Sequence, residues 1–266
     1  MIMGIIRKLI FPPKCVGCGE KFNIFAVGYD EKEVYCINCR AEWERTKISP
    51  CNTCKKACID CYCVPDPLNG TVAISLIKFG RSYSSDRLIY ALKRRNNERI
   101  FDFASSELAR RLKTYMWEFK KDGSETVITH VPRKPSSVST YGFDHAERLA
   151  CGISERTGIS AVTALKRRRG GKDQKKLDAG DRIKNSLDRF VLIDDAIPLL
   201  KDKTVIIVDD VITSGATAAA CIQKLRACGA CEIIVLSIAK SSIPRKKKDK
   251  NKKNPERRKG GSDGVV

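Results

Sequence analysis

The feature that most constrains this 266-residue chain is a strand that ends in two adjacent carboxylates and leads at once into a loop of small residues and a helix. Val205 to Val208 form a continuous β-branched run, which is typical of a buried parallel strand. Open α/β sheets bind ligands beyond the carboxyl ends of such strands, and Asp209 and Asp210 follow there. The loop that comes next consists of Thr213, Ser214, Gly215, Ala216 and Thr217.

This order of elements predicts a site for a phosphorylated sugar. Glycine at position 215 lets backbone N–H groups approach a phosphate closely. The loop hydroxyls and a helix that starts near Ala216 add donors and positive potential. Asp209 and Asp210 would then face the sugar. The structural alternative is a solvated Asp-Asp turn before a capped helix, which would need no ligand.

Residues 204–217 resemble the phosphoribosyl pyrophosphate (PRPP) signature of type I phosphoribosyltransferases along its whole length. In that family the acidic pair contacts the ribose hydroxyls near a Mg²⁺ that also holds the pyrophosphate, and the Thr-rich loop wraps the 5′-phosphate. The resemblance implies catalytic and PRPP-binding roles for Asp209 and Asp210. It implies PRPP binding for Thr213, Ser214, Gly215, Ala216 and Thr217, with Mg²⁺ as the cofactor.

Further motifs resemble the ComF family over nearly the whole chain to about residue 240. Residues 127–133 read as a strand ending in a Val-Pro-Arg turn, and Tyr141-Gly-Phe-Asp-His-Ala146 opens a helix. The series continues with Asp173-Gln174, Arg182, Asn185 and Phe190. By this resemblance Arg133 and Lys93 are expected to contact PRPP, although a solvated helix face is an equal interpretation for Lys93.

The chain departs from the ComF pattern at Tyr141, Asp144 and His145, where Arg, Asn and Gln are usual. These positions are expected near the pyrophosphate or the acceptor, so the resemblance implies PRPP binding more directly than turnover. A ComF-like protein is expected in the cytoplasm, acting with competence-machinery proteins in DNA uptake by handling single-stranded DNA. The alternative is an active phosphoribosyltransferase of nucleotide salvage or related metabolism, with an unidentified acceptor.

Nine of the thirteen cysteines lie between Cys15 and Cys63. Two C-x₂-C pairs, made of Cys15, Cys18, Cys36 and Cys39, have the spacing of a four-thiolate Zn²⁺ site. A second site is expected among Cys51, Cys54, Cys58, Cys61 and Cys63, without a choice of four. Disulfides are the alternative, but residues 1–10 lack the order of a signal peptide, and we expect a reducing cytoplasm that disfavours them. Closed Cys₄ sites are structural.

Several other residues are expected to be structural. Cys151, Cys221, Cys228 and Cys231 lie in apolar patterns and are predicted to be small buried side chains. His130 is interpreted as a strand residue rather than a ligand. Residues 1–10 are far too short to span a membrane and are expected to form a docking helix or strand.

The chain divides into three expected parts: a cysteine-rich zinc-binding module (1–66), a phosphoribosyltransferase-like domain (67–240) and a disordered basic tail (241–266). Strand patterns at 71–79, 127–131, 189–194, 204–208 and 232–239 alternate with helical ones near 85–97, 102–120, 144–156 and 216–228. That alternation predicts an α/β fold with a mostly parallel sheet flanked by helices. Residues 165–182 are expected to form a mobile, ligand-facing loop.

The net charge of +20 indicates a polyanionic partner. Residues 241–266 carry ten Lys and Arg against three Asp and Glu, so this tail supplies +7 and the body about +13. Phosphate contacts from such a body favour nucleic acid through counterion release, and the ComF resemblance implies that this is single-stranded DNA. A basic tail that merely aids solubility is the alternative.

Overall fold

The computed structural model describes residues 10–168 and 189–241. Residues 1–9, most of the predicted loop up to residue 182 and nearly all of the basic tail lie outside this description, so the expectations for them stay predictions. Within the described ranges, no helix combines the length and apolar character needed to cross a bilayer.

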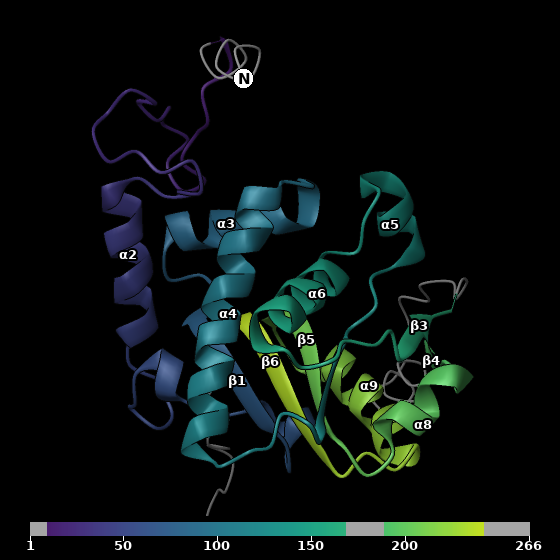
Figure 1. Ribbon diagram of the computed structural model, residues 1–266. Helices are drawn as coiled ribbons and strands as arrows, with labels where there is room; N and C mark the ends of the chain where they lie inside the picture. The colour runs from purple at the N-terminus through teal and green to yellow at the C-terminus, as the bar shows by residue number, and fades with distance from the viewer. Residues whose placement is uncertain (1–9, 169–188, 242–266) are drawn as a thin grey trace, which may run out of the picture.

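A four-stranded parallel sheet forms the centre of the molecule, in the order β1-β6-β5-β2 (Figure 1). Its strands are β1 (Val72–Lys78), β2 (Thr126–His130), β5 (Thr204–Ile212) and β6 (Glu232–Lys240). The mostly parallel sheet expected from the sequence is therefore confirmed. β5 is a central strand, as its continuous apolar run indicates.

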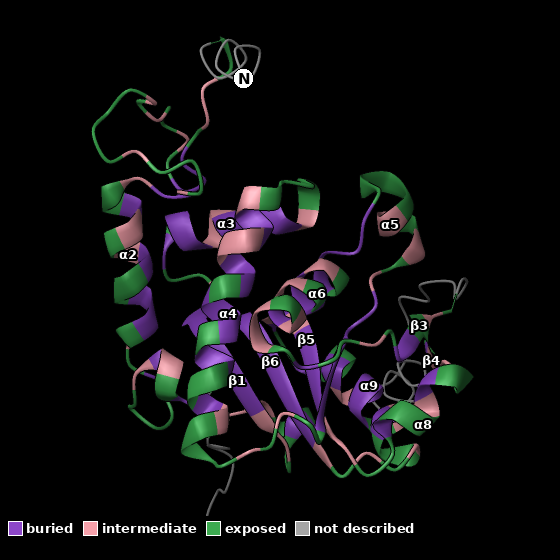
Figure 2. Ribbon diagram, viewed as in Figure 1, coloured by how far each residue is buried: buried purple, intermediate pink, exposed green. Residues whose placement is uncertain are grey.

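Helices cover both faces of this sheet (Figure 1). Ile206 and Val208 of β5 belong to the core cluster beneath the helices of one face, whereas Val205 and Ile207 belong to the cluster on the other face. The first face carries α3 (Tyr83–Arg94), α4 (Glu98–Glu118) and α6 (His145–Thr157), and the second carries α9 (Ala216–Ala227). Figure 2 shows the strands buried between these layers.

The predicted strand at 189–194 lies outside the main sheet. β4 (Phe190–Leu192) pairs antiparallel with β3 (Leu165–Arg167), and this ribbon packs against α9 through the buried side chains of Leu165 and Phe190. Periodicity identified a strand here but could not assign its partner. The short elements η1 (Cys58–Asp60), η2 (Asp66–Leu68), η3 (Asp194–Ala196) and α8 (Ile197–Leu200) complete the connections.

Two further helices were not expected. α5 (Pro135–Tyr141) begins at a proline and ends at Gly142, whose φ of 78° provides the left-handed C-cap. α2 (Ile37–Ile48) begins within the second C-x₂-C pair, with Cys36 as its N-cap and Cys39 in its first turn. Its sequence lacks an amphipathic pattern, and both terminal isoleucines are exposed.

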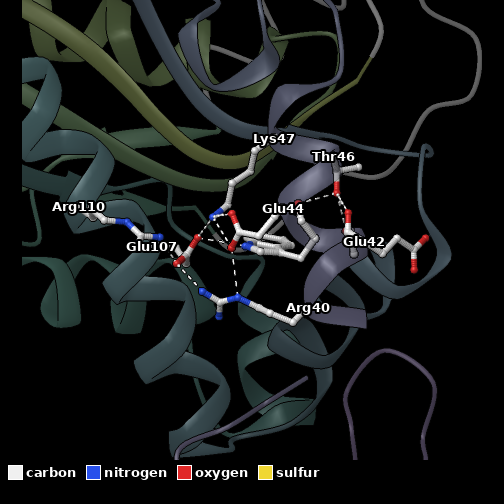
Figure 3. A network of polar contacts seen from close by, with 9 residues as sticks. Arg40, Glu42, Glu44, Thr46, Lys47, Glu107 and Arg110 are labelled. Atoms are coloured by element: carbon white, nitrogen blue, oxygen red, sulfur yellow. Dashed lines mark hydrogen bonds and ion pairs between the residues drawn. The ribbon is translucent and has the colours of Figure 1, made fainter. Parts of the chain in front are cut away.

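A buried polar network anchors α2 to α4 (Figure 3). Trp43 Nε1 donates a hydrogen bond of 3.0 Å to Glu107 Oε2, and Lys47 forms an ion pair with the same oxygen. Burial alone would raise the pKa of the Glu107 carboxyl. The interactions with Lys47 and Trp43 outweigh the effect of burial, so the pKa is lowered. Trp43 and Tyr35 belong to the same core cluster as Leu108 of α4. The cysteine-rich segment therefore shares its core with the parallel sheet and its helices.

Candidate functional site

Asp209 and Asp210 lie where β5 extends beyond its neighbour β2. The pairing of the two strands ends at His130 and Val208, while β5 continues to Ile212 beside β6. Consequently the two carboxylates stand at the carboxyl edge of the sheet, the edge at which α/β proteins of this kind bind ligands.

Asp210 is buried, and its carboxylate contacts Lys93 and His145. Its Oδ2 atom is 2.9 Å from Lys93 Nζ and 3.5 Å from His145 Nε2. Burial alone would raise the pKa of Asp210, but the interactions with His145 and Lys93 outweigh burial and lower it to about 2. The carboxylate is therefore ionised at neutral pH. Lys93, for which the sequence left two interpretations open, contacts the acidic pair although its side chain is 40% exposed.

Asp209 is in the opposite electrostatic situation. Its Oδ1 accepts a 2.8 Å hydrogen bond from the backbone N–H of Asp210. Burial, and then the charge of Asp210, raise the pKa of Asp209 well above its ordinary value. The pair therefore holds one stable negative charge, and a second one is disfavoured until a cation compensates it.

The arrangement fits a bound divalent cation. Asp210 Oδ2 is buried and, apart from its contacts with Lys93 Nζ and His145 Nε2, has no hydrogen-bond partner among the described residues. One ligand atom each from His145, Asp209 and Asp210 lie within 4.8 Å of one another. Carboxylate oxygens are the ligands that Mg²⁺ prefers. The two aspartates are thus the residues that would hold Mg²⁺ here.

His145 is the residue of this site that was absent from the predicted ligand set. It is the first residue of α6, it is buried, and its Nδ1 atom has no hydrogen-bond partner. Asp144 is fully engaged as the N-cap, accepting hydrogen bonds from Ala146 N and Glu147 N with one oxygen and from Arg133 N with the other. In the sequence, the adjacent Asp144 and His145 at the expected start of the helix were the signal that could have identified His145 as a site residue.

Arg133 makes structural contacts with the segments around the acidic pair's neighbours Lys93 and His145. Its guanidinium donates hydrogen bonds to the carbonyl oxygens of Lys93 (2.6 Å) and Phe143 (3.2 Å) and stacks over the ring of Tyr141. These contacts tie the end of α3 to the segment before α6, so Arg133 positions Lys93. His130 is the buried last residue of β2, and burial lowers its pKa.

The loop after the acidic pair is open to solvent. Thr213, Ser214, Ala216 and Thr217 are exposed, and the 12-residue helix α9 starts at Ala216. Gly215 has a φ of 78°, and an added Cβ would lie 2.8 Å from Pro65 Cγ. Its lack of a side chain is therefore required by the backbone and by contact with η2. The exposed small residues at a helix N-terminus fit a phosphate group.

A single substitution tests this description of the acidic pair. Because the pKa of Asp209 is raised, its ionisation weakens the fold as pH rises through that pKa. We therefore expect Asp209→Asn to raise the melting temperature at pH 7 and to lose this advantage at acidic pH, where Asp209 is already neutral. Thermal melts between pH 4 and 8 measure this. Asp210→Asn is the control, since it removes the ion pair with Lys93 and the negative charge beside His145, and should give no gain. A lower melting temperature for Asp209→Asn at pH 7 would contradict the description.

The cysteines gather into two groups of four. In each group, Cys15, Cys18, Cys36 and Cys39 or Cys51, Cys54, Cys61 and Cys63, the sulfur atoms lie within 4.8 Å of one another. Cys58 stands outside both groups as a fully buried thiol. All thirteen cysteines are free. Zn–S bonds of about 2.3 Å place tetrahedral sulfurs about 3.8 Å apart, so both donor sets fit zinc.

Backbone N–H groups support the thiolate form in both groups. Cys36 N donates to Cys15 Sγ at 3.2 Å, and Thr53 N donates to Cys51 Sγ at 3.4 Å. Burial would raise the pKa of Cys15, but these backbone hydrogen bonds outweigh burial and lower it to about 7. Thiolates are the form that binds a metal.

Two buried lysines lie beneath the second cysteine group. Lys240 Nζ donates a 2.7 Å hydrogen bond to the carbonyl oxygen of Cys61, and Lys78 Nζ donates one of 2.8 Å to that of Pro50. The two lysines are register partners at the ends of β6 and β1. Four thiolates around Zn²⁺ leave a net charge of −2, which two lysines balance. Buried charges are rare unless compensated, so this pairing supports a metal at the second group.

The prediction that the four remaining cysteines are buried is only partly correct. Cys221 is buried within α9 and Cys228 is half-buried, but Cys151 and Cys231 are exposed. Cys151 lies on the outer side of α6, and Cys231 lies in the turn before β6. An apolar pattern in sequence does not distinguish these positions from the core.

Residues 143–262 match the phosphoribosyl transferase domain family. Solved structures with similarity include an allosteric regulatory enzyme of purine biosynthesis (22% identity, TM-score 0.36, covering 56% of this chain and 30% of that one). A second is PRPP synthetase from Mycobacterium smegmatis (17% identity, TM-score 0.33, covering 51% of this chain and 34% of that one). A third is purine phosphoribosyltransferase from Pyrococcus horikoshii (22% identity, TM-score 0.31, covering 54% of this chain and 75% of that one). The chain thus spans about a third of the length of each of the first two proteins. A search of curated proteins found no match.

Proposed function

We propose that this chain, a type I phosphoribosyltransferase-like protein, binds PRPP with Mg²⁺ at the carboxyl end of β5. The observation that carries this proposal is that the adjacent carboxyl groups of Asp209 and Asp210 have pKa values shifted in opposite directions. Asp210 stays ionised beside Lys93 and His145, whereas the charge of Asp209 is disfavoured until a cation compensates it. The pair directly precedes an exposed loop at a helix N-terminus, so a cation site and a phosphate site are adjacent.

Each part of PRPP has a corresponding group in the chain. Backbone N–H groups and hydroxyls of residues 213–217 would hold the 5′-phosphate. Asp209 and Asp210 would orient the ribose and hold Mg²⁺, which neutralises charge on the pyrophosphate. Lys93 lies beside Asp210 and is partly exposed, so its ammonium can also contact a pyrophosphate oxygen. No protein nucleophile is required, because an acceptor would attack the sugar directly.

The biological role that we propose is ComF-like, in cytoplasmic handling of single-stranded DNA during uptake, together with competence-machinery proteins. The body of the chain carries about +13 in addition to its basic tail, which supports a polyanionic partner. The second candidate is an active phosphoribosyltransferase of nucleotide metabolism. The adjacent cation and phosphate sites favour it, since they are the groups that turnover would use.

Calorimetry with PRPP tests the first part of this proposal. We expect binding in Mg²⁺ buffer and a large loss of affinity in buffer without added Mg²⁺, because the acidic pair repels the pyrophosphate when no cation is present. Chelators are avoided, since they would also remove zinc. A pyrophosphate-release assay with a panel of purines, pyrimidines and amines then separates the two roles. Release indicates an enzyme, and binding without release indicates a ligand sensor. Equal affinity with and without Mg²⁺ would contradict the site assigned to the pair.

A further inference from the structure

An open groove of about 460 Å³ runs between the outer face of α3 and the turn that carries the first cysteine pair. Its walls include Val16, Tyr83, Arg87, Tyr90, Arg94 and Arg95. Asp86 also lines it, but one of its carboxylate oxygens accepts a 3.0 Å hydrogen bond from the N–H of Gly80. The groove is therefore aromatic and net basic.

The aromatic and basic residues of the groove alternate along one side of the helix. Tyr83, Arg87, Tyr90 and Arg94 are spaced by four, three and four residues, which places them on a single stripe. The opposite side of α3 already fills the core with Leu88, Ile89 and Leu92. Core packing therefore does not require the stripe to be aromatic.

Each tyrosine ring of the groove contacts a neighbouring side chain and still exposes a large part of its surface. Tyr83 is 72% exposed and Tyr90 is 49% exposed. The guanidinium of Arg87 lies over the Tyr83 ring and donates a hydrogen bond to its hydroxyl, and Phe79 packs edge-on against Tyr90. Fixed rings lose little entropy when a flat ligand stacks on them.

We propose that this groove binds a segment of single-stranded nucleic acid, with bases stacked on Tyr83 and Tyr90 and phosphates paired with Arg87 and Arg94. The inference rests on the DNA-handling part of the proposed function and assigns a surface to it. Exposed aromatic rings alternating with arginines are the combination that binds single strands without sequence preference. In a duplex the base faces are already stacked, so the tyrosines would add nothing.

The groove borders the first cysteine group, and the helix that forms it ends beside the acidic pair. Its second wall includes Val16, between two cysteines of the first group, and an added Cβ at Gly19 would lie 3.9 Å from the Arg87 guanidinium. At the end of the same helix, Lys93 contacts Asp210 while the next residue, Arg94, lines the groove. A metal in the first cysteine group would fix the wall against which the strand lies.

Fluorescence anisotropy with labelled single-stranded oligonucleotides, DNA and RNA, tests this surface. We expect Tyr83→Ala with Tyr90→Ala to weaken single-strand binding at least tenfold, because each stacked base contributes about five- to 150-fold. The corresponding Phe pair should bind as the unmodified protein does. Arg87→Ala with Arg94→Ala should flatten the log–log salt dependence by about 1.4 units. Controls are Trp117→Ala for an exposed ring and Lys113→Ala with Lys120→Ala for two exposed charges.

The outcomes separate the groove from the wider proposal. If the unmodified protein binds no single strand at low salt, the DNA-handling function and this surface both fail. If it binds, but the tyrosine pair can be removed without loss or duplex competes equally well, the groove is wrong and DNA handling stands. PRPP calorimetry on the same variants is expected to give unchanged affinity, so a failure at the PRPP site would be visible independently.

Discussion

Replacing Asp209 and Asp210 together by asparagine is expected to weaken PRPP binding in Mg²⁺ by about a hundredfold to ten-thousandfold. Each carboxylate would make a charge-assisted contact, and such contacts contribute about 1.5–3 kcal/mol each. Together the two losses amount to about 3–6 kcal/mol. Asparagine keeps the shape of each side chain but cannot compensate the charge of a cation. Calorimetry at fixed Mg²⁺ concentration measures the change.

The chain contains a matched control for this experiment. Asp194 and Asp195 form a second adjacent pair, which is exposed in η3. Asp194→Asn with Asp195→Asn removes the same number of carboxyl groups and should leave PRPP affinity unchanged. Thermal melts exclude unfolding as the cause, since Asp209→Asn alone is expected to stabilise the protein. A dissociation constant unaffected by the loss of Asp209 and Asp210 would show that this pair is only structural.

The central sheet could be predicted because its signals are local. The run from Val205 to Val208 has apolar side chains at every position, and the structure uses odd and even positions for opposite faces. The sequence also places two carboxylates and a glycine-containing loop directly after this run, so their proximity follows from the chain itself. Neighbouring residues in one strand and turn need no tertiary information.

Contacts between distant segments could not be predicted in this way. His145 reaches Asp210 across 65 positions only because α6 begins beside the end of β5, and periodicity does not specify that packing. Lys78 and Lys240 likewise look like ordinary strand-end lysines until the second cysteine group covers them. Gly215 was interpreted through phosphate approach, whereas its contact with Pro65 gives a separate reason for glycine.

The cysteine groups could be predicted from the sequence only in part. Spacing was sufficient to group Cys15 and Cys18 with the pair at 36 and 39, because each C-x₂-C turn brings two thiols together. It was insufficient in the second set, where five thiols compete for four positions. The structure separates Cys58 from the others because only the sulfur atoms of Cys51, Cys54, Cys61 and Cys63 lie within 4.8 Å of one another. Cys58 is a fully buried thiol outside this group, and burial raises its pKa to about 11.

We expect the purified protein to carry two zinc ions and to lose one of them, with much of its stability, on Cys39→Ser. Structural zinc contributes about 10–16 kcal/mol to the folding of small modules, which far exceeds a typical core substitution. Cys39 is also part of the cluster that contains Trp43, so its site and the shared core are coupled. A fall in melting temperature of about 10 °C or more is therefore expected.

The two tryptophans make the extent of this unfolding measurable. Trp43 is fully buried and Trp117 is 83% exposed. In a Trp117→Phe background, fluorescence reports Trp43 alone, and a red shift in Cys39→Ser or on chelation would show that α2 has left the core. Because α2 packs on α3 and α4, we expect the loosening to reach α3 rather than to stop at the cysteine-rich segment.

Metal analysis of two further variants completes the test. Cys54→Ser should retain one zinc, since Cys54 belongs to the second group, and Cys58→Ala should retain two, since Cys58 belongs to neither. Cys231→Ser controls for the loss of an exposed thiol. Protein prepared without chelator that contains no zinc would contradict both sites. Two zinc ions in Cys39→Ser would instead show that Cys39 is dispensable as a ligand, and its burial beside Gly17 would then reflect packing alone.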